Sequence, residues 1–314
     1  SFTLDPKGTY AAAAKQLISA PPLKETGGSA AVNLGLFYNS NVELLPDILR
    51  TTNNSGDLGL QTDIQLLWSF PDSSIRYIFS DTAHQNRSEY DITMHLFGGS
   101  WALNNWQLSP SFEYIALNKE KLYQGYALNT TYNQESWAYH YAIKSKAYSG
   151  SYGSTNANLA RLGGLTHNLG MATSTKFQDM QASFTADIIS EQTNGDASHD
   201  KTDNYTQLSL AAQLVYPSIK DFILSSSIQT YTRKYAKADT TALLNPASNT
   251  IRSDTYFNIA ASVAWSPFSD KDSSFILDVS YQKNNSNYDE GTVNNLAIKS
   301  YAAWKTQMSF SKQW

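Results

Sequence analysis

Five histidines are the residues of this sequence best suited to acid–base chemistry near neutral pH. His95 and His140 fall in segments whose side chains alternate between polar and apolar, whereas His84 and His199 fall near connecting segments. His167 lies in a segment with no clear pattern. A hydrolase needs a histidine within hydrogen-bond reach of a serine or aspartate, oriented by a third group. The sequence holds no local serine–histidine signature, so we expect no catalytic residue and no enzyme activity.

The sequence also gives little support for a metal site or for nucleic-acid binding. The sequence contains no cysteine, which excludes a disulfide scaffold, a thiolate metal site and a cysteine nucleophile. Asn194-Gly195-Asp196 is the nearest approach to a calcium loop, and a solvated acidic loop from Glu191 to Asp203 explains it better. The formal net charge of −4 gives no basic patch for nucleic acid. We therefore expect no metal, no cofactor and no nucleic-acid partner.

An alternation of apolar and polar residues runs from residue 30 to the end of the chain. In the segment 205–216, for example, Leu208 and Leu210 alternate with Gln207 and Ser209. Successive side chains of a β-strand point to opposite faces, so this period predicts strands. The expected fold is all-β, with fourteen antiparallel strands. Their approximate bounds are 30–42, 58–70, 74–84, 89–103, a strand from 106, 121–132, 136–148, 156–169, 179–190, 205–216, 220–235, 254–265, 274–284 and 298–314.

The last of these strands is long, aromatic and ends on an aromatic residue. Trp304, Met308, Phe310 and Trp314 share one of its faces. A final amphipathic strand of this kind resembles the closing strand of a bacterial outer-membrane β-barrel. No stretch of the chain approaches the roughly 20 apolar residues that a membrane-spanning helix needs. A polar chain can nevertheless cross a bilayer as a barrel, because only alternate residues meet lipid.

The connections and the aromatic residues support a transmembrane barrel. Long polar connections such as Glu43–Asp57 and Ala236–Ser253 tend to alternate with short ones such as Pro71–Ser73. Outer-membrane barrels have long external loops and short periplasmic turns. Aromatic residues beside the short turns would form a girdle at one membrane interface, where Trp and Tyr are favoured. The girdle residues are Trp68, Trp106, Trp137, Tyr216, Trp265 and Trp314.

The polar faces of the expected strands carry charged side chains in mid-strand. Charges in a dry core are costly, whereas a water-filled lumen tolerates them. The apolar faces are therefore expected to meet lipid and the polar faces to line a channel. We also expect the acidic and basic residues to face one another across the pore, which would give weak ion selectivity. The expected lumen-lining residues are Asp63, Arg76, Asp91, His95, Glu113, His140, Lys144, Asp187, Arg233, Asp278 and Lys305.

The first 29 residues differ from the rest of the chain. The segment Thr9–Ser19 predicts a short helix, with Thr9 as N-cap and Pro21-Pro22 as a stop. An isolated helix of this length is marginal in water, so it needs a surface to rest on. We therefore divide the chain into an N-terminal helical arm or plug, residues 1–29, and a barrel, residues 30–314. An even number of strands places both ends of the barrel on the same side.

Two short runs carry a resemblance to a particular family. The run from Asn33 to Asp47 (NLGLFYNSNVELLPD) and the run from Tyr281 to Tyr288 (YQKNNSNY) resemble segments of outer-membrane barrels that follow tetratricopeptide domains. The surface lipoprotein assembly modifiers are one such family, with a 14-strand barrel. The resemblance implies an export role. The chain departs from that pattern because it contains no full 34-residue repeat.

These observations predict an outer-membrane channel that passes a hydrophilic solute, or an exported polymer or polypeptide, through a polar lumen. The alternative is a structural or anchoring barrel with a blocked lumen, which binds a periplasmic or secreted protein through its loops or its N-terminal arm. The expected surroundings are the lipid bilayer of the bacterial outer membrane, with its lipopolysaccharide. Both termini would be periplasmic, and the long loops would be extracellular.

Overall fold

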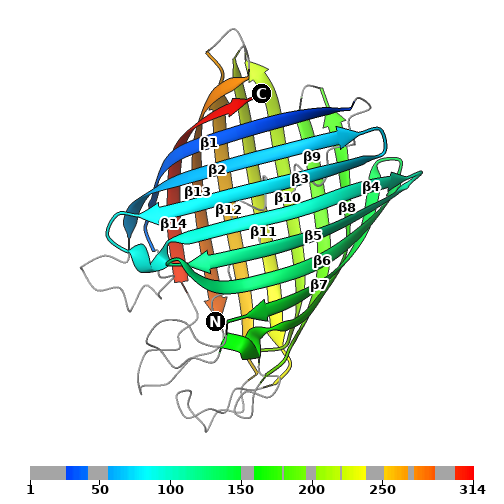
Figure 1. Ribbon diagram of the computed structural model, residues 1–314, viewed down its shortest axis with the longest axis vertical. Coiled ribbons are helices and arrows are strands. Elements are labelled where there is room, and N and C mark those ends of the chain that lie inside the picture. The colour runs from blue at the N-terminus through cyan, green and yellow to red at the C-terminus, as the bar shows by residue number, and fades with distance from the viewer. Residues whose placement is uncertain are drawn as a thin grey trace.

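The computed structural model describes residues 26–41, 56–149, 159–178, 180–195, 203–219, 221–237, 251–267, 272–286 and 301–314. These residues form a closed antiparallel β-barrel with tilted strands (Figure 1). Its strands are β1 Gly27–Asn39, β2 Asp57–Phe70, β3 Ser73–His84, β4 Ile92–Leu103, β5 Trp106–Leu117, β6 Glu120–Gln134, β7 Trp137–Tyr148, β8 Gly164–Phe177, β9 Met180–Thr193, β10 Tyr205–Ile219, β11 Phe222–Tyr235, β12 Ser253–Trp265, β13 Ser273–Ser286 and β14 Tyr301–Gln313.

Each strand pairs with the next along the chain, and β14 returns to pair with β1. At this seam the backbone N–H of Trp314 donates to the carbonyl of Ala30 at 2.7 Å, and the N–H of Ala30 donates back at 3.0 Å. The C-terminal strand therefore closes the barrel, as its aromatic alternation predicts. The described residues confirm the expected fourteen antiparallel strands, and closure removes the unpaired edges that an open sheet would leave.

The alternation of side chains decides which face of each strand points outward. Leu208 and Leu210 of β10 are exposed, whereas Gln207 and Ser209 between them are buried. The same arrangement recurs around most of the barrel, since most large apolar residues are exposed outside and most charged residues lie inside. The main exception is a buried apolar cluster of Ile115, Leu117, Leu122 and Tyr123. The register of β10 against β9 and β11 is continuous over most of its length, which keeps the two faces separate along the strand.

One end of the barrel carries tight turns, and we call it the short-turn end. There Asn104 adopts a φ of 55° between β4 and β5, a left-handed conformation that asparagine tolerates better than most residues. The other end, the long-loop end, is not uniform. At that end β5 and β6 are joined only by Asn118 and Lys119, both at positive φ, as in the tight turns that match strand twist.

Among the described residues, two single-turn 3₁₀ helices lie at the long-loop end, η2 at Ser88–Tyr90 and η3 at Leu159–Leu162. After η3 the chain turns back onto the barrel, where the N–H of Asn194 donates to the carbonyl of Gly163 at 2.7 Å. Arg161 of η3 forms an ion pair with Asp203 at 3.0 Å. Within the residues that the structure describes, no helix is long and apolar enough to cross a membrane.

The structure corrects two sequence expectations, and a third concerns residues that the structure does not describe. The eighth strand is not 156–169 but Gly164–Phe177, because the glycines and Arg161 that blurred the pattern belong to η3 and the start of the strand. β1 begins at Gly27, so the last residues of the expected arm, up to residue 29, already pair with β2. The expected helix at Thr9–Ser19 lies outside the described residues.

Candidate functional site

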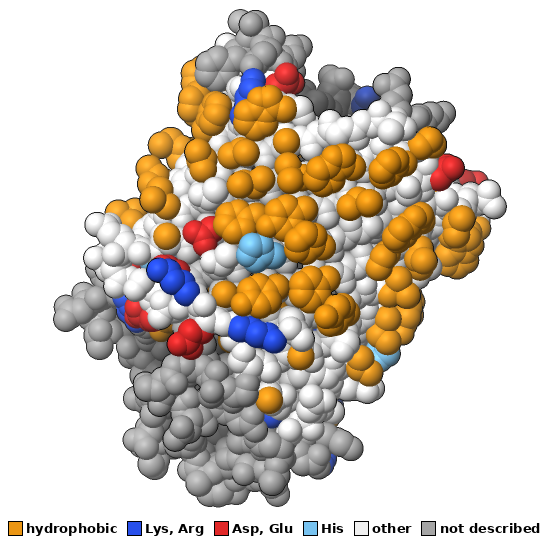
Figure 2. Space-filling view, viewed as in Figure 1, with side chains coloured by type: hydrophobic (Ala, Val, Ile, Leu, Met, Phe, Trp, Pro, Cys, Tyr) orange, Lys and Arg blue, Asp and Glu red, His pale blue; other side chains and the backbone are white. Residues whose placement is uncertain are grey.

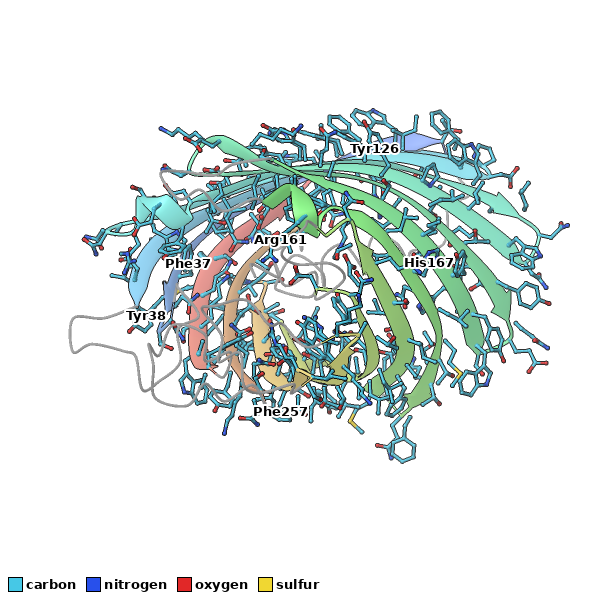
Figure 3. The ribbon with its side chains drawn as sticks, turned by 90° about the horizontal axis from the view of Figure 1, so that it is seen from below. Phe37, Tyr38, Tyr126, Arg161, His167 and Phe257 are labelled. Carbon is cyan, nitrogen blue, oxygen red and sulfur yellow. The ribbon has the colours of Figure 1, made fainter. Side chains whose placement is uncertain are left out.

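The candidate site is the inner face of the barrel, which is polar and charged. Asp187 and Arg233 are each only 6% exposed, whereas Leu36 and Leu277 on the outer face are 57% and 46% exposed. Hydrophobic side chains cover much of the outer surface in Figure 2. Seen along the barrel in Figure 3, Phe37 points to the interior, whereas Tyr38, Tyr126 and Phe257 lie outside. A water-soluble protein places these two classes the other way round.

The residues expected to form the aromatic girdle all lie on the outer face near the short-turn end. The outward-facing, exposed girdle residues are Trp68, Trp106, Trp137, Tyr216, Trp265 and Trp314. Their rings contact neighbours on adjacent strands, for example Trp106 against Tyr132 and Trp265 stacked on Phe222. A second band of outward aromatics, absent from the sequence prediction, lies toward the long-loop end. It includes Tyr38, Tyr126, Phe257, Tyr281 and Trp304.

Nine of the eleven residues expected to line the lumen lie on inward positions of their strands. They are Asp63, Arg76, Glu113, His140, Lys144, Asp187, Arg233, Asp278 and Lys305. They do not face one another across the pore in the way that the sequence analysis expects. The ion pairs of Glu113, His140, Lys144 and Asp187 run along the barrel wall, between strands that are two apart in the sheet. The charges are therefore held at the wall.

His95 does not line the lumen, and this expectation is wrong. It pairs directly with Phe79 on β3 and Tyr114 on β5, and its Nδ1 lies 2.9 Å from the hydroxyl of Tyr77. These residues share the outer face with Phe97, which is 51% exposed. The error arises because the start of β4 inverts the pattern of the other strands. Its inward residues there, Ile92, Met94 and Leu96, are apolar, whereas the outward Thr93 and His95 are polar, so that Met94 looks like a lipid-facing residue.

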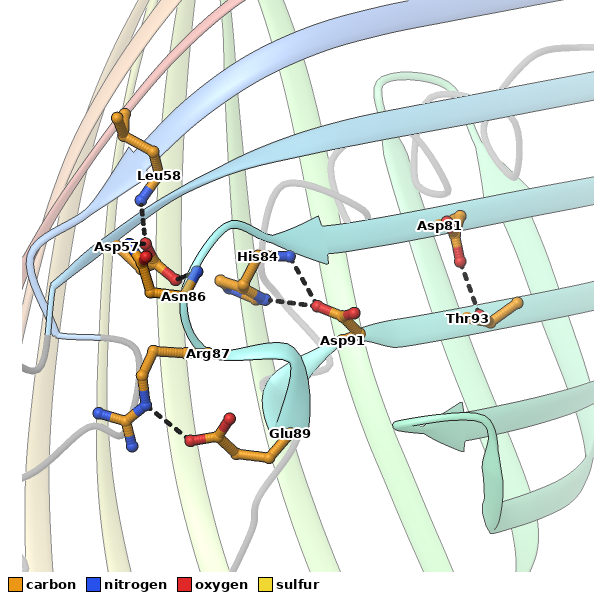
Figure 4. Close-up of polar contacts among 9 residues, drawn as sticks. All are labelled: Asp57, Leu58, Asp81, His84, Asn86, Arg87, Glu89, Asp91 and Thr93. Atoms are coloured by element: carbon orange, nitrogen blue, oxygen red, sulfur yellow. Dashed lines mark hydrogen bonds and ion pairs between the residues drawn. The ribbon is translucent and has the colours of Figure 1, made fainter.

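Asp91 also departs from its expected place, because it precedes β4 at the long-loop end (Figure 4). Its Oδ1 accepts a hydrogen bond from the backbone N–H of His84 at 2.6 Å and lies 3.3 Å from His84 Nδ1. It therefore stabilises the β3–β4 connection. In the same connection Arg87 Nε donates to Glu89 Oε1 at 2.6 Å, and this hydrogen bond lowers the pKa of the Glu89 carboxyl.

Glu113 on β5 and Lys144 on β7 form an ion pair that crosses β6. The strand between them offers Gly125, where an added Cβ would clash with the Tyr123 side chain and crowd Lys144. The Tyr123 hydroxyl also donates to Glu113 Oε2 at 3.3 Å. Glycine at this position thus leaves room for side chains from both neighbouring strands to meet above the sheet.

His140 on β7 reaches Asp187 on β9 in the same way. Its Nε2 lies 2.7 Å from Asp187 Oδ1, and Gly170 of β8 is directly opposite both residues in the register. A Cβ at position 170 would clash with both side chains. Closer to the long-loop end, Lys146 of β7 forms an ion pair with Glu191 of β9. Three inward cationic or titratable side chains of β7 are therefore tied to acids on the strands two places away.

Arg233 of β11 lies within a cluster of aromatic and amide side chains. Its Nε and Nη2 both donate to Gln207 Oε1, at 3.0 Å and 2.9 Å. Its guanidinium lies 4.1 Å from the Tyr205 ring centroid and 5.0 Å from that of Tyr231. Such cation–π contacts compensate a buried cation for part of its lost hydration. Tyr231 stacks in turn on Tyr256, with centroids 4.7 Å apart.

Asp63 is the centre of a polar cluster beside the seam of β14, β1 and β2. It accepts hydrogen bonds from Ser80 Oγ at 2.6 Å, Gln61 Nε2 at 2.9 Å and Asn33 Nδ2 at 3.1 Å. On the same wall, Lys305 Nζ lies 5.0 Å from the centroid of the buried Phe37 ring. The inner wall near the short turns is different, since it carries buried hydroxyls. Among them are Ser69 and Ser109.

The described histidines are engaged in pairs that do not form a hydrolytic site. His84 and His140 bond to aspartates, and His95 and His167 bond to tyrosines on the outer face. His199 lies outside the described residues. Among the described residues, no group of three or more His, Asp or Glu side chains could hold a metal ion.

Comparisons with known proteins return structures only. No protein-family model and no curated protein matches the sequence. Solved structures similar to the chain include a bacterial polysaccharide outer membrane secretin, at 12% identity and a TM-score of 0.48 over 91% of this chain and 98% of that one. Another is an anion-selective porin from Comamonas acidovorans, at 7% identity and a TM-score of 0.48 over 92% and 99%.

A third is the outer membrane protein opdK from Pseudomonas aeruginosa, at 8% identity and a TM-score of 0.45 over 93% of this chain and 100% of that one. Structural similarity at TM-scores below 0.5 does not indicate what this chain does. The resemblance to surface lipoprotein assembly modifiers stays a prediction.

Sequence reasoning missed several members of the inner-face network. Lys146 and Glu191 form one ion pair, and Arg252 and Asp254 form another at 2.5 Å near the long-loop end. The signal for Lys146 was present, because it lies two residues after Lys144 and so shares its face. Gly170 could not be found in this way, because its importance depends on the register of β7, β8 and β9.

Proposed function

We propose that this protein is an outer-membrane channel that passes a small hydrophilic solute through the polar interior of the barrel. One observation supports the proposal above all others: in this closed barrel most apolar side chains face outward and most charged side chains face inward, the reverse of a water-soluble barrel. Large apolar side chains are exposed outside, whereas charged side chains are buried inside. The exposed apolar side chains are favourable in contact with lipid, and the buried charged side chains are favourable if the interior has polar contents. The aromatic bands at both ends of the outer face match two membrane interfaces.

The proposed localisation is the bacterial outer membrane, with the short-turn end in the periplasm and the long-loop end outside. The end of β14 and the start of β1 both lie at the short-turn end, so the chain would enter and leave the barrel from the periplasm. Bacterial outer-membrane barrels carry short periplasmic turns, which supports this orientation. The surrounding partners would be lipid and lipopolysaccharide.

Because charges on the wall are paired, we expect the channel to pass neutral solutes and to have only weak ion selectivity. Lys144 and Lys146 each have an acid beside them on the wall, so their positive charges are compensated. A channel that selects strongly for one ion sign would need unbalanced rings of charge. Passage of an exported polymer or polypeptide, which the resemblance to surface lipoprotein assembly modifiers implies, is the alternative cargo.

Solute flux into liposomes tests the proposal with a matched pair of variants. Ala211 lies on the inner face of β10, and the next residue, Ala212, lies on the outer face. The wild-type barrel should admit small neutral sugars, and Ala211→Trp should slow their entry several-fold. Ala212→Trp should leave the flux unchanged. Equal flux for both variants, or no flux through a folded barrel, would contradict the proposal.

A further inference from the structure

The inner wall where β14, β1 and β2 meet carries polar atoms that are buried and lack a hydrogen-bond partner. They are the side-chain oxygens Asn33 Oδ1, Gln61 Oε1, Gln307 Oε1 and Ser309 Oγ. Gln61 and Gln307 are each 2% exposed, and Ser309 is 3% exposed. Solvent therefore does not reach these atoms. Buried polar groups are nearly always hydrogen-bonded, so four in one place indicate an occupant.

The four atoms form one site rather than a scattered set. Gly35 of β1 is directly opposite Ser309 on β14 and Gln61 on β2, while Asn33 and Gln307 lie one inward position away along the strands. A Cβ at position 35 would approach Ser309 Cβ to 2.9 Å and Gln307 Nε2 to 3.1 Å. The glycine thus lets the side chains of both neighbouring strands converge above β1.

The chemistry of the site specifies hydrogen-bond donors. Three of the four atoms are amide carbonyl oxygens, which only accept, and the fourth is a hydroxyl, which can also accept. Asp63 and Lys305 both border the site, so acid and base offset each other there. An occupant must therefore present N–H or O–H groups.

We propose that the occupant is the N-terminal segment of this same chain, residues 1–25. That segment leads into Gly27 at the foot of β1, the strand at the centre of the site. The site lies eight residues up β1, or about 26 Å. A chain of 25 residues can span about 80 Å when extended, so it reaches the site even when it is partly folded. Its backbone N–H groups and Lys7 and Lys15 supply the required donors.

Distances between spin labels test this placement without disturbing the site. The chain has no native cysteine, so Ala12→Cys can be paired with Met308→Cys on β14 or with Met171→Cys on β8, seven strands from β1 in the closed order. Both methionines are exposed on the outer face. We expect a narrow distance distribution to position 308 and a clearly longer mean distance to position 171. Equal means or broad distributions for both pairs would overturn the proposal.

A second comparison tests the site itself. Gln61→Leu with Gln307→Leu removes two acceptors and should broaden the distribution between labels 12 and 308. Gln213→Leu with Gln229→Leu, on inward positions of β10 and β11, is the matched control and should leave it unchanged. Folding of each variant is confirmed by its heat-dependent migration on gels. If the distribution is unaffected in a folded site variant, then water or a solute occupies the site and not the arm. These outcomes do not depend on transport, so they are independent of the proposed function.

Discussion

His140 Nε2 lies 2.7 Å from Asp187 Oδ1, although the two residues are on β7 and β9 and a third strand runs between them. The contact exists because Gly170 of β8 has no side chain to separate them. Glu113 and Lys144 meet across Gly125 on β6 by the same arrangement. Pairs of this kind join β5 to β7 and β7 to β9, and they hold the charges of this part of the wall in place beside the lumen.

Gly170→Ala should break the contact between His140 and Asp187. The new Cβ displaces both side chains, and the lost charge-assisted hydrogen bond costs about 1–3 kcal/mol. Urea unfolding in lipid vesicles measures the change. Gly27→Ala is the control, because nothing lies within 4 Å of a Cβ at that position. In a His140→Ala background, Gly170→Ala should lower the free energy of unfolding much less. An equal loss in both backgrounds would show that the glycine is not needed for the contact between His140 and Asp187.

Arginine substitutions should distinguish the two faces of the strands. Leu210 and Leu277 are exposed on the outer face, near the middle of their strands. Leu210→Arg or Leu277→Arg should each cost about 2–4 kcal/mol, because the new charge must enter hydrocarbon. Gln213→Arg places the same charge inside and should cost little. Folding free energies in vesicles measure the difference, and similar penalties at all three positions would argue against a lipid-facing exterior.

Asp63 and Asp278 should influence ion selectivity more than the paired acids do. Asp63 accepts hydrogen bonds from three neutral side chains, and it shares the nearby Lys305 with Asp278, so the two acids keep a net negative charge beside the lumen. Asp63→Asn with Asp278→Asn should shift the reversal potential in a salt gradient toward anion preference. Glu113→Gln with Lys144→Gln removes a balanced pair and should leave it nearly unchanged. A larger shift from the balanced pair would contradict this reading of the wall.

The contact between Arg87 and Glu89 should contribute a small, pH-dependent stability. The pKa of Glu89 is lowered in the folded state, chiefly by the hydrogen bond from Arg87. A depressed carboxyl pKa stabilises the fold above its ordinary value of about 4.3 and loses that contribution as pH falls through the lowered pKa. Both side chains are solvated, so Arg87→Ala should cost less than about 1 kcal/mol at pH 7. Unfolding curves across pH measure the effect of Arg87→Ala. In a Glu89→Gln background, that effect should no longer depend on pH.

Much of the fold could be predicted because its strands obey a period of two. The closing strand, the girdle residues and nine inward residues followed from that period alone. His95 was misplaced, although a signal was available, since Phe97 and Trp101 share its parity and are the aromatic residues that face outward. The start of β4 is apolar on its inward face and polar at Thr93 and His95 on its outward face, so only the later residues of the strand identify the lipid-facing side correctly.

The network on the inner face could not be predicted in the same way. Whether Lys144 meets Glu113 depends on the register of three strands, which a single sequence does not contain. The eighth strand was displaced because Arg161 and the glycines near it were read as part of a strand. Glycines such as Gly125 and Gly170 look like breaks in a pattern, yet their role appears only when the neighbouring side chains are placed above them.

Single-channel recording in a planar bilayer tests the central claim most directly. If the interior of this barrel is a polar path across a membrane, the recordings should show discrete conductance steps that scale with salt concentration. The steps should be larger after deletion of residues 1–23, which precede every described strand. If protein that is shown to be folded and inserted gives no conductance, both with and without those residues, the interior is not such a path and the proposed function is wrong.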